Sequence, residues 1–299
     1  FPYDMRPQGH DIIRTWLFAT MTRSHHEFGC APWKNAALSG WILDPDRKKM
    51  SKSKGNVVTP MDLFDQYGTD AVRYWSASGR PGVDTAYSED QMKVGRKLAN
   101  KLLNVTKFVL TFPEADASIP LADAVTDPVD LSMLAKLDDV IADATAGFEA
   151  FDYARALDRT ESFFWWFCDN YVELVKGRAY NSRGPEAANS ALRALREALG
   201  SVQRLFAPMI PFATEEAWSW WNTTSVHAAS WPAPSALSGD ATLIDPVIDT
   251  LAHVRRAKTE AKQSQKAAVE SLVVTAPVAL HVAVTAGDGD LRDAGSIAT

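Results

Sequence analysis

The sequence predicts a mainly α-helical protein with a partial α/β domain near its start. Apolar residues recur at helical spacing over most of residues 58–230. A short apolar segment at 36–43 runs directly into a lysine-rich loop, as a buried strand feeding a binding loop would. Segments rich in proline at 113–128 and 230–245 separate the helical regions. Since 299 residues exceed what one hydrophobic core usually supports, two or three domains are expected.

Composition and charge argue against several classes of protein. The net charge of -6 speaks against attraction of nucleic acid to the whole surface, so any RNA contact needs local basic patches. No apolar run approaches the roughly 18 residues that cross a bilayer, so no membrane partner is expected. Cys30 and Cys168 stand far apart without a second zinc ligand nearby, which predicts reduced thiols, a cytoplasmic protein and no bound zinc. The adjacent His25 and His26 do not share a helix face, so no metal site is predicted there.

The first elements suggest half of a nucleotide-binding fold. Residues 9–23 are spaced as a helix that begins near Asp11, whose carboxylate could cap free backbone donors. Residues 36–43 then form the predicted strand. A helix, a strand and a phosphate-binding loop at the carboxyl end of that strand indicate an open α/β sheet with its ligand at the strand tips. The N-terminus runs at once into patterned sequence, so we expect the chain to begin inside a domain.

The lysine-rich loop is the most distinctive segment. Residues 47–56 place five cations within eight residues of an otherwise acidic chain. Lysines are mobile point charges that suit a polyanion, and Ser51 and Ser53 add hydroxyl donors. Gly55 allows a tight bend. A merely solvated basic loop is the alternative for such a cluster, but the order of the residues favours phosphate binding.

Three helices are predicted after this loop. Thr59 can cap a helix with Pro60 at its first position and Gly68 at its end. A short helix follows at 70–76, and a longer one runs from 88 to about 111. Lysine and arginine occupy the polar face of the longer helix, which could either contact RNA or simply face solvent.

Beyond residue 128 the pattern becomes that of a helical bundle. Apolar stripes over 131–148 and 192–206 flank a segment, 153–180, that is apolar on nearly every side. Its five consecutive aromatic residues, 163–167, could stack on unpaired RNA bases. A core role is favoured, with at most two rings at the surface, because five large rings cannot all face solvent cheaply.

The last part is expected to form a small α+β tail. Residues 246–270 predict a helix with a second concentration of basic residues. Residues 272–275 and 280–285 are rich in β-branched side chains and resemble two short strands.

The order of residues in the lysine loop resembles that of a known family. Lys49 to Ser53 reads Lys-Met-Ser-Lys-Ser, the second signature of class I aminoacyl-tRNA synthetases, and continues into Lys54-Gly55-Asn56 as theirs does. Residues 9–16, Gly-His-Asp-Ile-Ile-Arg-Thr-Trp, resemble the Gly-x-Asp segment of the large members for aliphatic amino acids, and the two isoleucines look like those of the valine members. Residues 67–73 and 167–173 are similar to later family segments. The resemblance covers about residues 1–230, and the first family signature, His-x-Gly-His, and the editing domain are not in this sequence.

The resemblance implies a role for each of these segments in valine:tRNA ligation. Gly9 and Asp11 would bind the ribose of ATP, and the backbone near Ile42 and Leu43 would read adenine. Ile12 and Trp16 would line the valine pocket, although a core role for Trp16 stays open. The loop residues implied to close on the triphosphate of Mg-ATP are Lys49, Met50, Ser51, Lys52 and Ser53, of which Lys49 and Lys52 would offset charge on the departing pyrophosphate.

The same resemblance implies a domain order and the partners of the protein. Residues 1–57 would be the C-terminal half of a Rossmann-like catalytic domain, 58–112 a helical connector that contacts the tRNA stem, 128–230 the anticodon-binding bundle and 245–299 the tail. The partners would be ATP, valine and valine tRNA isoacceptors, without DNA, and the protein a monomer. The candidate tRNA-binding residues are Lys97, Lys101, Lys176, Arg178 and Arg183.

Two alternatives remain at this stage. The chain could be a noncatalytic tRNA-binding module, since the upstream half of the site is not in the sequence. The parent enzyme could also use isoleucine or leucine, because the lysine loop is shared among these synthetases.

Overall fold

The computed structural model describes residues 1–299, with residue 279 by its backbone alone. The chain divides into two compact units. The first contains Phe1–Asn100 and Ala144–Asp158, and the second contains Lys101–Asp143 and Arg159–Thr299. Among the residues that the model describes, no helix is long and apolar enough to cross a membrane.

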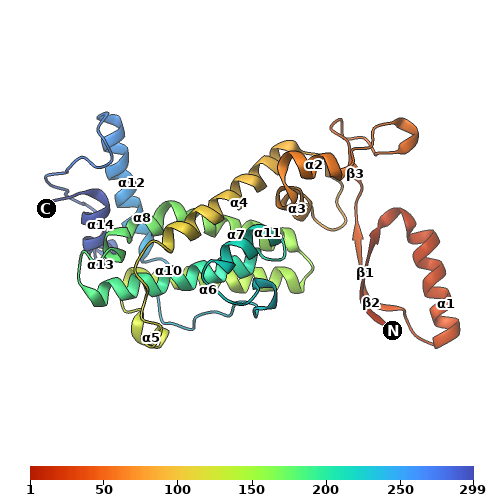
Figure 1. Ribbon diagram of the computed structural model, residues 1–299, viewed down its shortest axis with the longest axis horizontal. Coiled ribbons are helices and arrows are strands. Elements are labelled where there is room, and N and C mark those ends of the chain that lie inside the picture. The colour runs from red at the N-terminus through yellow and green to blue at the C-terminus, as the bar shows by residue number, and fades with distance from the viewer. The chain divides into compact units, whose positions relative to one another are not determined.

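The first unit begins with a parallel strand pair connected by a helix (Figure 1). Strand β1 (Tyr3–Gly9) pairs with β2 (Trp33–Ser39), in register from Tyr3 opposite Trp33 to Gly9 opposite Ser39. The connection is a 3-10 turn at His10–Ile12, a π-helical turn at Ile13–Leu17 and helix α1 (Phe18–Phe28). The predicted α/β element is therefore present as a two-stranded unit.

Two details of this region differ from the prediction. Gly9 occupies the N-cap position and no side chain caps the first turn, so the predicted capping role of Asp11 is wrong. Asp11 lies inside the turn, and its carboxylate instead lies 3.7 Å from the Lys49 ammonium nitrogen. The apolar side chains of this segment are largely open to solvent, with Trp16 43% exposed.

The predicted strand at 36–43 is divided at Gly40. Strand β2 ends at Ser39, and β3 (Ile42–Leu43) pairs in parallel with β4 (Thr85–Ala86) instead. A Cβ atom on Gly40 would lie 2.3 Å from the Val83 carbonyl oxygen, so only glycine permits this approach. The close contact fixes the segment before the lysine loop against Val83, which is 43 residues after Gly40.

The three helices predicted after the loop are confirmed. They are α2 (Pro60–Tyr67), α3 (Thr69–Ala77) and α4 (Glu89–Val109). Gly68 separates α2 from α3 with a φ of 90°, a conformation that other residues rarely adopt. Thr59 is the N-cap residue of α2, but its side chain makes no capping hydrogen bond. The buried side chains at the centre of this cluster are Leu63, Tyr67, Ala71, Val72, Trp75 and Met92.

The second unit contains the predicted helical bundle (Figure 1). Its long helices are α6 (Pro128–Glu149), α7 (Tyr153–Trp166) and α10 (Pro185–Phe206). Shorter elements complete it, namely α5 (Leu121–Ala124), a π-helical turn (Phe167–Tyr171), α8 (Val172–Leu174), α9 (Lys176–Ala179) and α11 (Pro211–Ser219). Helices α4, α6 and α7 contribute residues to both units.

The run of five aromatic residues is part of the bundle core. Phe163, Phe164 and Phe167 are buried, while Trp165 and Trp166 are half-buried. The ring of Phe164 meets that of Phe206 edge to face at a centroid distance of 5.5 Å. The favoured core role is therefore confirmed, since none of the five rings is fully exposed.

The proline-rich segment before α6 packs against the bundle. Arg193 on α10 donates hydrogen bonds of 2.6 and 3.0 Å to the carbonyl oxygens of Asp116 and Ile119. The Asp116 N–H donates to the side chain of Asn189, also on α10, at 3.1 Å. Val125 is 2% exposed. Composition alone did not show that this segment is anchored.

The prediction of an α+β tail is wrong, because the tail is helical. Helix α12 (Ile244–Glu260) ends ten residues earlier than predicted, and α13 (Val278–Ala286) and α14 (Asp288–Gly295) follow. Residues 272–275 form no strand, and residues 280–285 lie in α13. Leu280 and Val284, four residues apart on one face of α13, line a cavity together with α12 residues.

The first testable prediction concerns the bundle core. Phe164→Ala should lower the free energy of unfolding by about 3–5 kcal/mol, because it leaves a cavity at a fully buried position. Urea titration followed by circular dichroism measures this. Phe212→Ala, at a ring that is 64% exposed, is the matched control and should change stability far less. Equal effects of the two substitutions would contradict the core assignment.

Candidate functional site

The carboxyl ends of β1 and β2 lie beside the start of the lysine loop. The Lys49 ammonium nitrogen lies 3.7 Å from the Asp11 carboxylate and 4.0 Å from the centroid of the Trp41 ring. The His10 ring lies 4.8 Å from the same indole, and its Nδ1 is 3.1 Å from the Ser39 carbonyl oxygen. Asp11 and Lys49 are both about half exposed, so a ligand can reach them. The structure thus brings together two residues that the sequence assigns to the ribose and to the phosphates.

A buried carboxylate holds the two ends of the lysine loop together. Asp44 is 6% exposed, and its oxygens accept hydrogen bonds of 2.7 Å from the Lys48 N–H and from the Asn56 side-chain amide. The Asn56 side-chain oxygen accepts from the Ser51 N–H at 3.0 Å, and its amide nitrogen also donates to the Lys49 carbonyl at 3.3 Å. The hydrogen bonds from Lys48 and then Asn56 lower the pKa of Asp44, so the carboxylate stays ionised among the loop cations.

The segment between these ends is left open to solvent. Lys52 and Lys54 lie on a 3-10 turn that ends at Gly55, where φ is 66°. Both lysines are exposed, and neither forms an ion pair with a described residue. Ser51 Oγ and Ser53 Oγ lie 3.3 Å apart. The loop therefore has a fixed base and a free cationic tip.

The backbone near Ile42 is only partly available to a ligand. The carbonyl oxygens of Trp41 and Leu43 already accept hydrogen bonds of 2.9 Å from the N–H groups of Thr85 and Tyr87. Because backbone groups alternate along a strand, the N–H and C=O of Ile42 point away from β4. Of the two residues expected to read adenine, Ile42 is therefore the one whose backbone N–H and C=O groups point away from β4, where a ligand can reach them.

Trp16 lies against the sheet and not in an enclosed pocket with Ile12. Its ring stacks on Trp33 at 6.0 Å, and the Arg6 guanidinium lies 4.1 Å from its centroid. The cavity along this helix, about 720 Å³, is lined by neither Ile12 nor Trp16. Its apolar lining residues are Ile13, Leu17, Phe18, Met21 and Ala31.

Several buried polar atoms near this edge have no hydrogen-bond partner among the described residues. They are the Arg6 Nε, both amide atoms of Gln8 and the Trp41 Nε1. Buried polar groups in folded proteins are nearly always paired, so these atoms mark positions where a ligand or a further protein segment would supply partners. Across the described residues, no group of three His, Cys, Asp or Glu side chains is placed to hold a metal ion.

A second candidate surface, basic and aromatic, lies on the bundle unit. The Lys176 ammonium lies 5.0 Å from the centroid of the Phe108 ring, which meets Phe112 at 5.0 Å. Phe112 in turn meets Tyr180 edge to face at 4.7 Å, and Tyr180 is 53% exposed. Lys101 pairs with the Asp169 carboxylate at 3.0 Å. We call Lys101, Phe108, Lys176 and Tyr180 the basic–aromatic surface.

Three of the five candidate tRNA-binding residues do not belong to this surface. Arg178 has no exposed side-chain area and is surrounded by carboxylates, so its predicted contact with tRNA is wrong. Arg183 is partly exposed but forms ion pairs with Asp127 and Asp290. Lys97 is exposed and lies in the other compact unit.

Sequence reasoning missed several residues of both sites. Trp41, Asp44 and Asn56 were not assigned roles, although Asn56 closes the Lys-Gly-Asn continuation of the loop motif. The sequence predicts no role in RNA binding for Phe108 or Tyr180. The nearby lysines were the signal that could have identified these two, because exposed aromatic residues beside cations suit RNA bases.

Comparison with known proteins adds independent evidence. Residues 1–88 match the family model for class I tRNA synthetases of the I, L, M and V type, and residues 130–273 match the model for the anticodon-binding domain of tRNA ligases. Together with the Lys-Met-Ser-Lys-Ser loop beside Asp11, these matches decide the family. The chain belongs to the class I aminoacyl-tRNA synthetases.

Relatives of this synthetase family include proteins named valine–tRNA ligase. The chain is 55% identical to that of Salinispora arenicola over 99% of its own length and 37% of the relative. It is 57% identical to that of Thermobifida fusca over 92% of its own length and 31% of the relative. The chain thus spans about a third of the length of the curated relatives it matches.

A solved synthetase structure has the same fold over most of the chain. The LeuRS of Agrobacterium radiobacter K84, crystallised as a ternary complex with tRNA and LeuAMS, aligns with a TM-score of 0.60 and 20% identity. The alignment covers 78% of this chain and 29% of that one. At this identity the similarity supports the fold alone.

The second testable prediction concerns the base of the lysine loop. Asp44→Ala removes the acceptor for both Lys48 and Asn56, so trypsin should cleave after Lys52 and Lys54 several-fold faster. Limited proteolysis with mass spectrometry measures the rate at each bond. Asp46→Ala removes an exposed carboxylate from the same loop and should leave the rates unchanged. If Asp44→Ala also left them unchanged, the carboxylate would not hold the loop.

Proposed function

We propose that the chain forms part of a valine:tRNA ligase and contributes the phosphate-binding loop and the anticodon-binding bundle. The observation that carries this proposal is the juxtaposition of Lys49 with Asp11 at the carboxyl end of β1. The names of the relatives support valine as the amino acid. The chemistry is the ATP-dependent formation of valyl-adenylate followed by transfer of valine to tRNA, in the cytoplasm.

The geometry suits the first of these two steps. A carboxylate accepts hydrogen bonds, so Asp11 can bind the ribose hydroxyls of ATP once Lys49 turns toward the phosphates. As the valine carboxylate attacks the α-phosphorus, negative charge builds on the leaving pyrophosphate, which Lys49 and Lys52 offset. The Mg²⁺ ion is bound as part of Mg-ATP, and no resident metal is proposed. Gly9, Ile42, Met50, Ser51 and Ser53 complete the proposed ATP contacts.

The proposed domain order follows from the family resemblance described above. Residues 1–57 belong to the catalytic domain, 58–112 form the stem-contact connector, 128–230 bind the anticodon arm and 245–299 form a C-terminal helical region. Ile12 and Trp16 stay the proposed wall of the valine pocket, with Trp16 held by Arg6 and Trp33. We propose that the protein acts as a monomer.

The basic–aromatic surface is the proposed tRNA contact. Stacking on an exposed aromatic ring contributes about 1–3 kcal/mol per base, and neighbouring lysines attract the phosphates. Lys101, Lys176 and Tyr180 provide both kinds of contact on one unit. Lys97 and Arg183 stay secondary candidates, while Arg178 is left out because it is buried.

The third testable prediction addresses catalysis. In a chimera, the chain replaces the matching third of the Salinispora arenicola ligase, and valine-dependent ATP–pyrophosphate exchange is measured. Lys52→Ala should slow exchange about 100-fold or more, because it removes charge stabilisation of the leaving group. Lys48→Ala, at an exposed lysine of the same loop paired with Asp46, is the control and should have little effect. Unchanged exchange in Lys52→Ala would refute the proposed role.

The fourth testable prediction addresses tRNA binding by the chain itself. Fluorescence anisotropy at one fixed salt concentration should show tighter binding to valine tRNA than to isoleucine or leucine tRNA. Tyr180→Ala should weaken binding about 10-fold, because the stacking ring is lost. Tyr180→Phe keeps the ring and should bind as the unaltered chain does. Equal affinity for all three tRNAs would argue against valine specificity in this part of the protein, and an unaffected Tyr180→Ala would place the tRNA elsewhere.

A further inference from the structure

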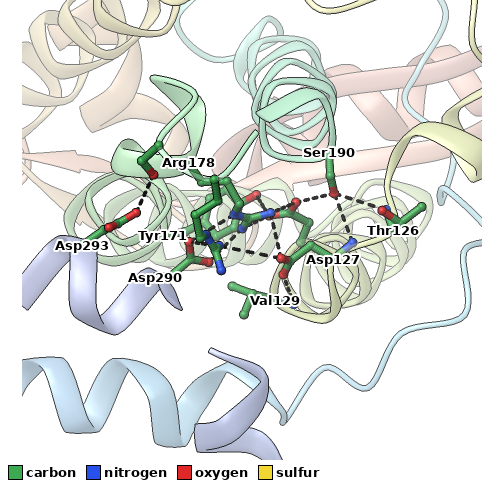
Figure 2. Close-up of polar contacts among 11 residues, drawn as sticks. Thr126, Asp127, Val129, Tyr171, Arg178, Ser190, Asp290 and Asp293 are labelled. Atoms are coloured by element: carbon green, nitrogen blue, oxygen red, sulfur yellow. Dashed lines mark hydrogen bonds and ion pairs between the residues drawn. The ribbon is translucent and has the colours of Figure 1, made fainter. Parts of the chain in front are cut away.

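A buried cluster of opposite charges connects several segments of the bundle unit (Figure 2). Arg178 has no exposed side-chain area and donates to both oxygens of Asp130 and both oxygens of Asp290. Asp127 lies 3.2 Å from the same guanidinium. Tyr171 and Ser190 donate to Asp130, each at 2.6 Å. The cluster therefore ties α9 to the N-terminal end of α6, to α10 and to α14.

Helix α9 follows α8 after the single residue Val175. Backbone hydrogen bonds from the Val175 N–H to the Tyr171 carbonyl (3.0 Å) and from the Ala179 N–H to the Val175 carbonyl (2.9 Å) continue the helical path. Side-chain contacts then hold this last turn against its neighbours. Arg178 provides the most buried of these, because it holds α6 on one side through Asp130 and α14 on the other through Asp290.

The outer face of α9 carries two of the four residues of the basic–aromatic surface, since Lys101 and Phe108 lie on α4. Lys176 and Tyr180 are four residues apart and so share one helix face, while Arg178, two residues from each, points to the opposite side. The Tyr180 N–H donates to the carbonyl oxygens of Lys176 and Gly177 at 3.1 Å each, which continues the turn. Any displacement of Arg178 would consequently move Lys176 and Tyr180.

Helix α14 packs closely against α9 from the C-terminal end of the chain. Asp293 accepts a hydrogen bond of 2.6 Å from Ser182 Oγ, and a Cβ atom on Gly177 would lie 2.6 Å from the same carboxylate oxygen. Asp290 also pairs with Arg183, the residue after Ser182. Figure 2 shows Asp290 and Asp293 approaching the Arg178 segment from α14. The match to the anticodon-binding family model ends at residue 273, before this helix.

We propose that α14 is a functional part of the tRNA-binding unit, in which Asp290 is a positioning residue that acts through Arg178 on Lys176 and Tyr180. This inference rests on the proposed tRNA contact at the basic–aromatic surface. It adds a role for residues 288–295 that lies outside the matched anticodon-binding domain. Asp290 itself, 1% exposed, does not touch RNA.

The fifth testable prediction measures the affinity of the full chain for valine tRNA at a temperature where circular dichroism shows it folded. Asp290→Asn should weaken binding about 5–10-fold and lower the melting temperature. Asp288→Asn, on the same helix but at an exposed pair with Arg292, is the matched control and should bind normally. In a Tyr180→Ala background, where only Lys176 is left to be displaced, Asp290→Asn should weaken binding clearly less than it does alone, while it still lowers the melting temperature by the same amount. A merely structural role would not produce this non-additivity.

A second variant guards against misfolding of Asp290→Asn. Ser182→Ala removes the contact with Asp293 without leaving a buried charge unpaired, and should weaken tRNA binding about two- to threefold with the same non-additivity. Normal tRNA affinity in both folded variants, with only the melting temperature changed, would overturn the inference. If Tyr180→Ala itself binds normally, the proposed tRNA contact fails instead, so the two failures are distinguishable.

Discussion

The bundle unit depends on the buried ion-pair cluster around Arg178. Removing charged groups from water costs several kcal/mol per ion, which the pairing offsets only when the geometry satisfies nearly every donor and acceptor. Burial alone lowers the pKa of Arg178, but the charge and hydrogen bonds of Asp130, together with Asp290 and Asp127, outweigh it and raise that pKa. Burial raises the pKa of Asp290 to about 6, although Arg178 and Arg183 oppose the shift. The Asp290 carboxylate therefore depends on the two arginines to stay charged.

This dependence explains why segments far apart in sequence behave as one unit. Asp130 and Asp290 are 160 positions apart, yet both bind the same guanidinium. Removing one partner would leave the charge of the buried arginine uncompensated. An incompletely formed cluster would therefore strongly destabilise the fold. The tail is thereby integrated with the bundle. The same fold that buries these charges presents Lys176 and Tyr180 on the other side of α9.

The lysine loop uses charge in a different way. Asp44 fixes the base of the lysine loop through hydrogen bonds to backbone and amide groups, while Lys52 and Lys54 are left exposed without ion-pair partners among the described residues. Phosphate binding needs cations that can move to a ligand, and a loop anchored at both ends limits that movement to the tip. Lys49, near Asp11 and Trp41, connects the loop with the strand edge where ribose binding is proposed.

The sequence by itself determined the class of fold, most helices and the order of residues in the lysine loop. Periodicity and glycine or proline signals are local, so they located α2, α3, α4, α6 and α10 correctly. The sequence did not determine the division of the strand at Gly40, the helical tail or the burial of Arg178. These depend on contacts with Val83, with α12 and with Asp130 and Asp290, which no local pattern records. An arginine is expected to be a surface cation unless the fold brings carboxylates around it, and only the tertiary structure buries Arg178 among three carboxylates while it leaves Tyr180 exposed.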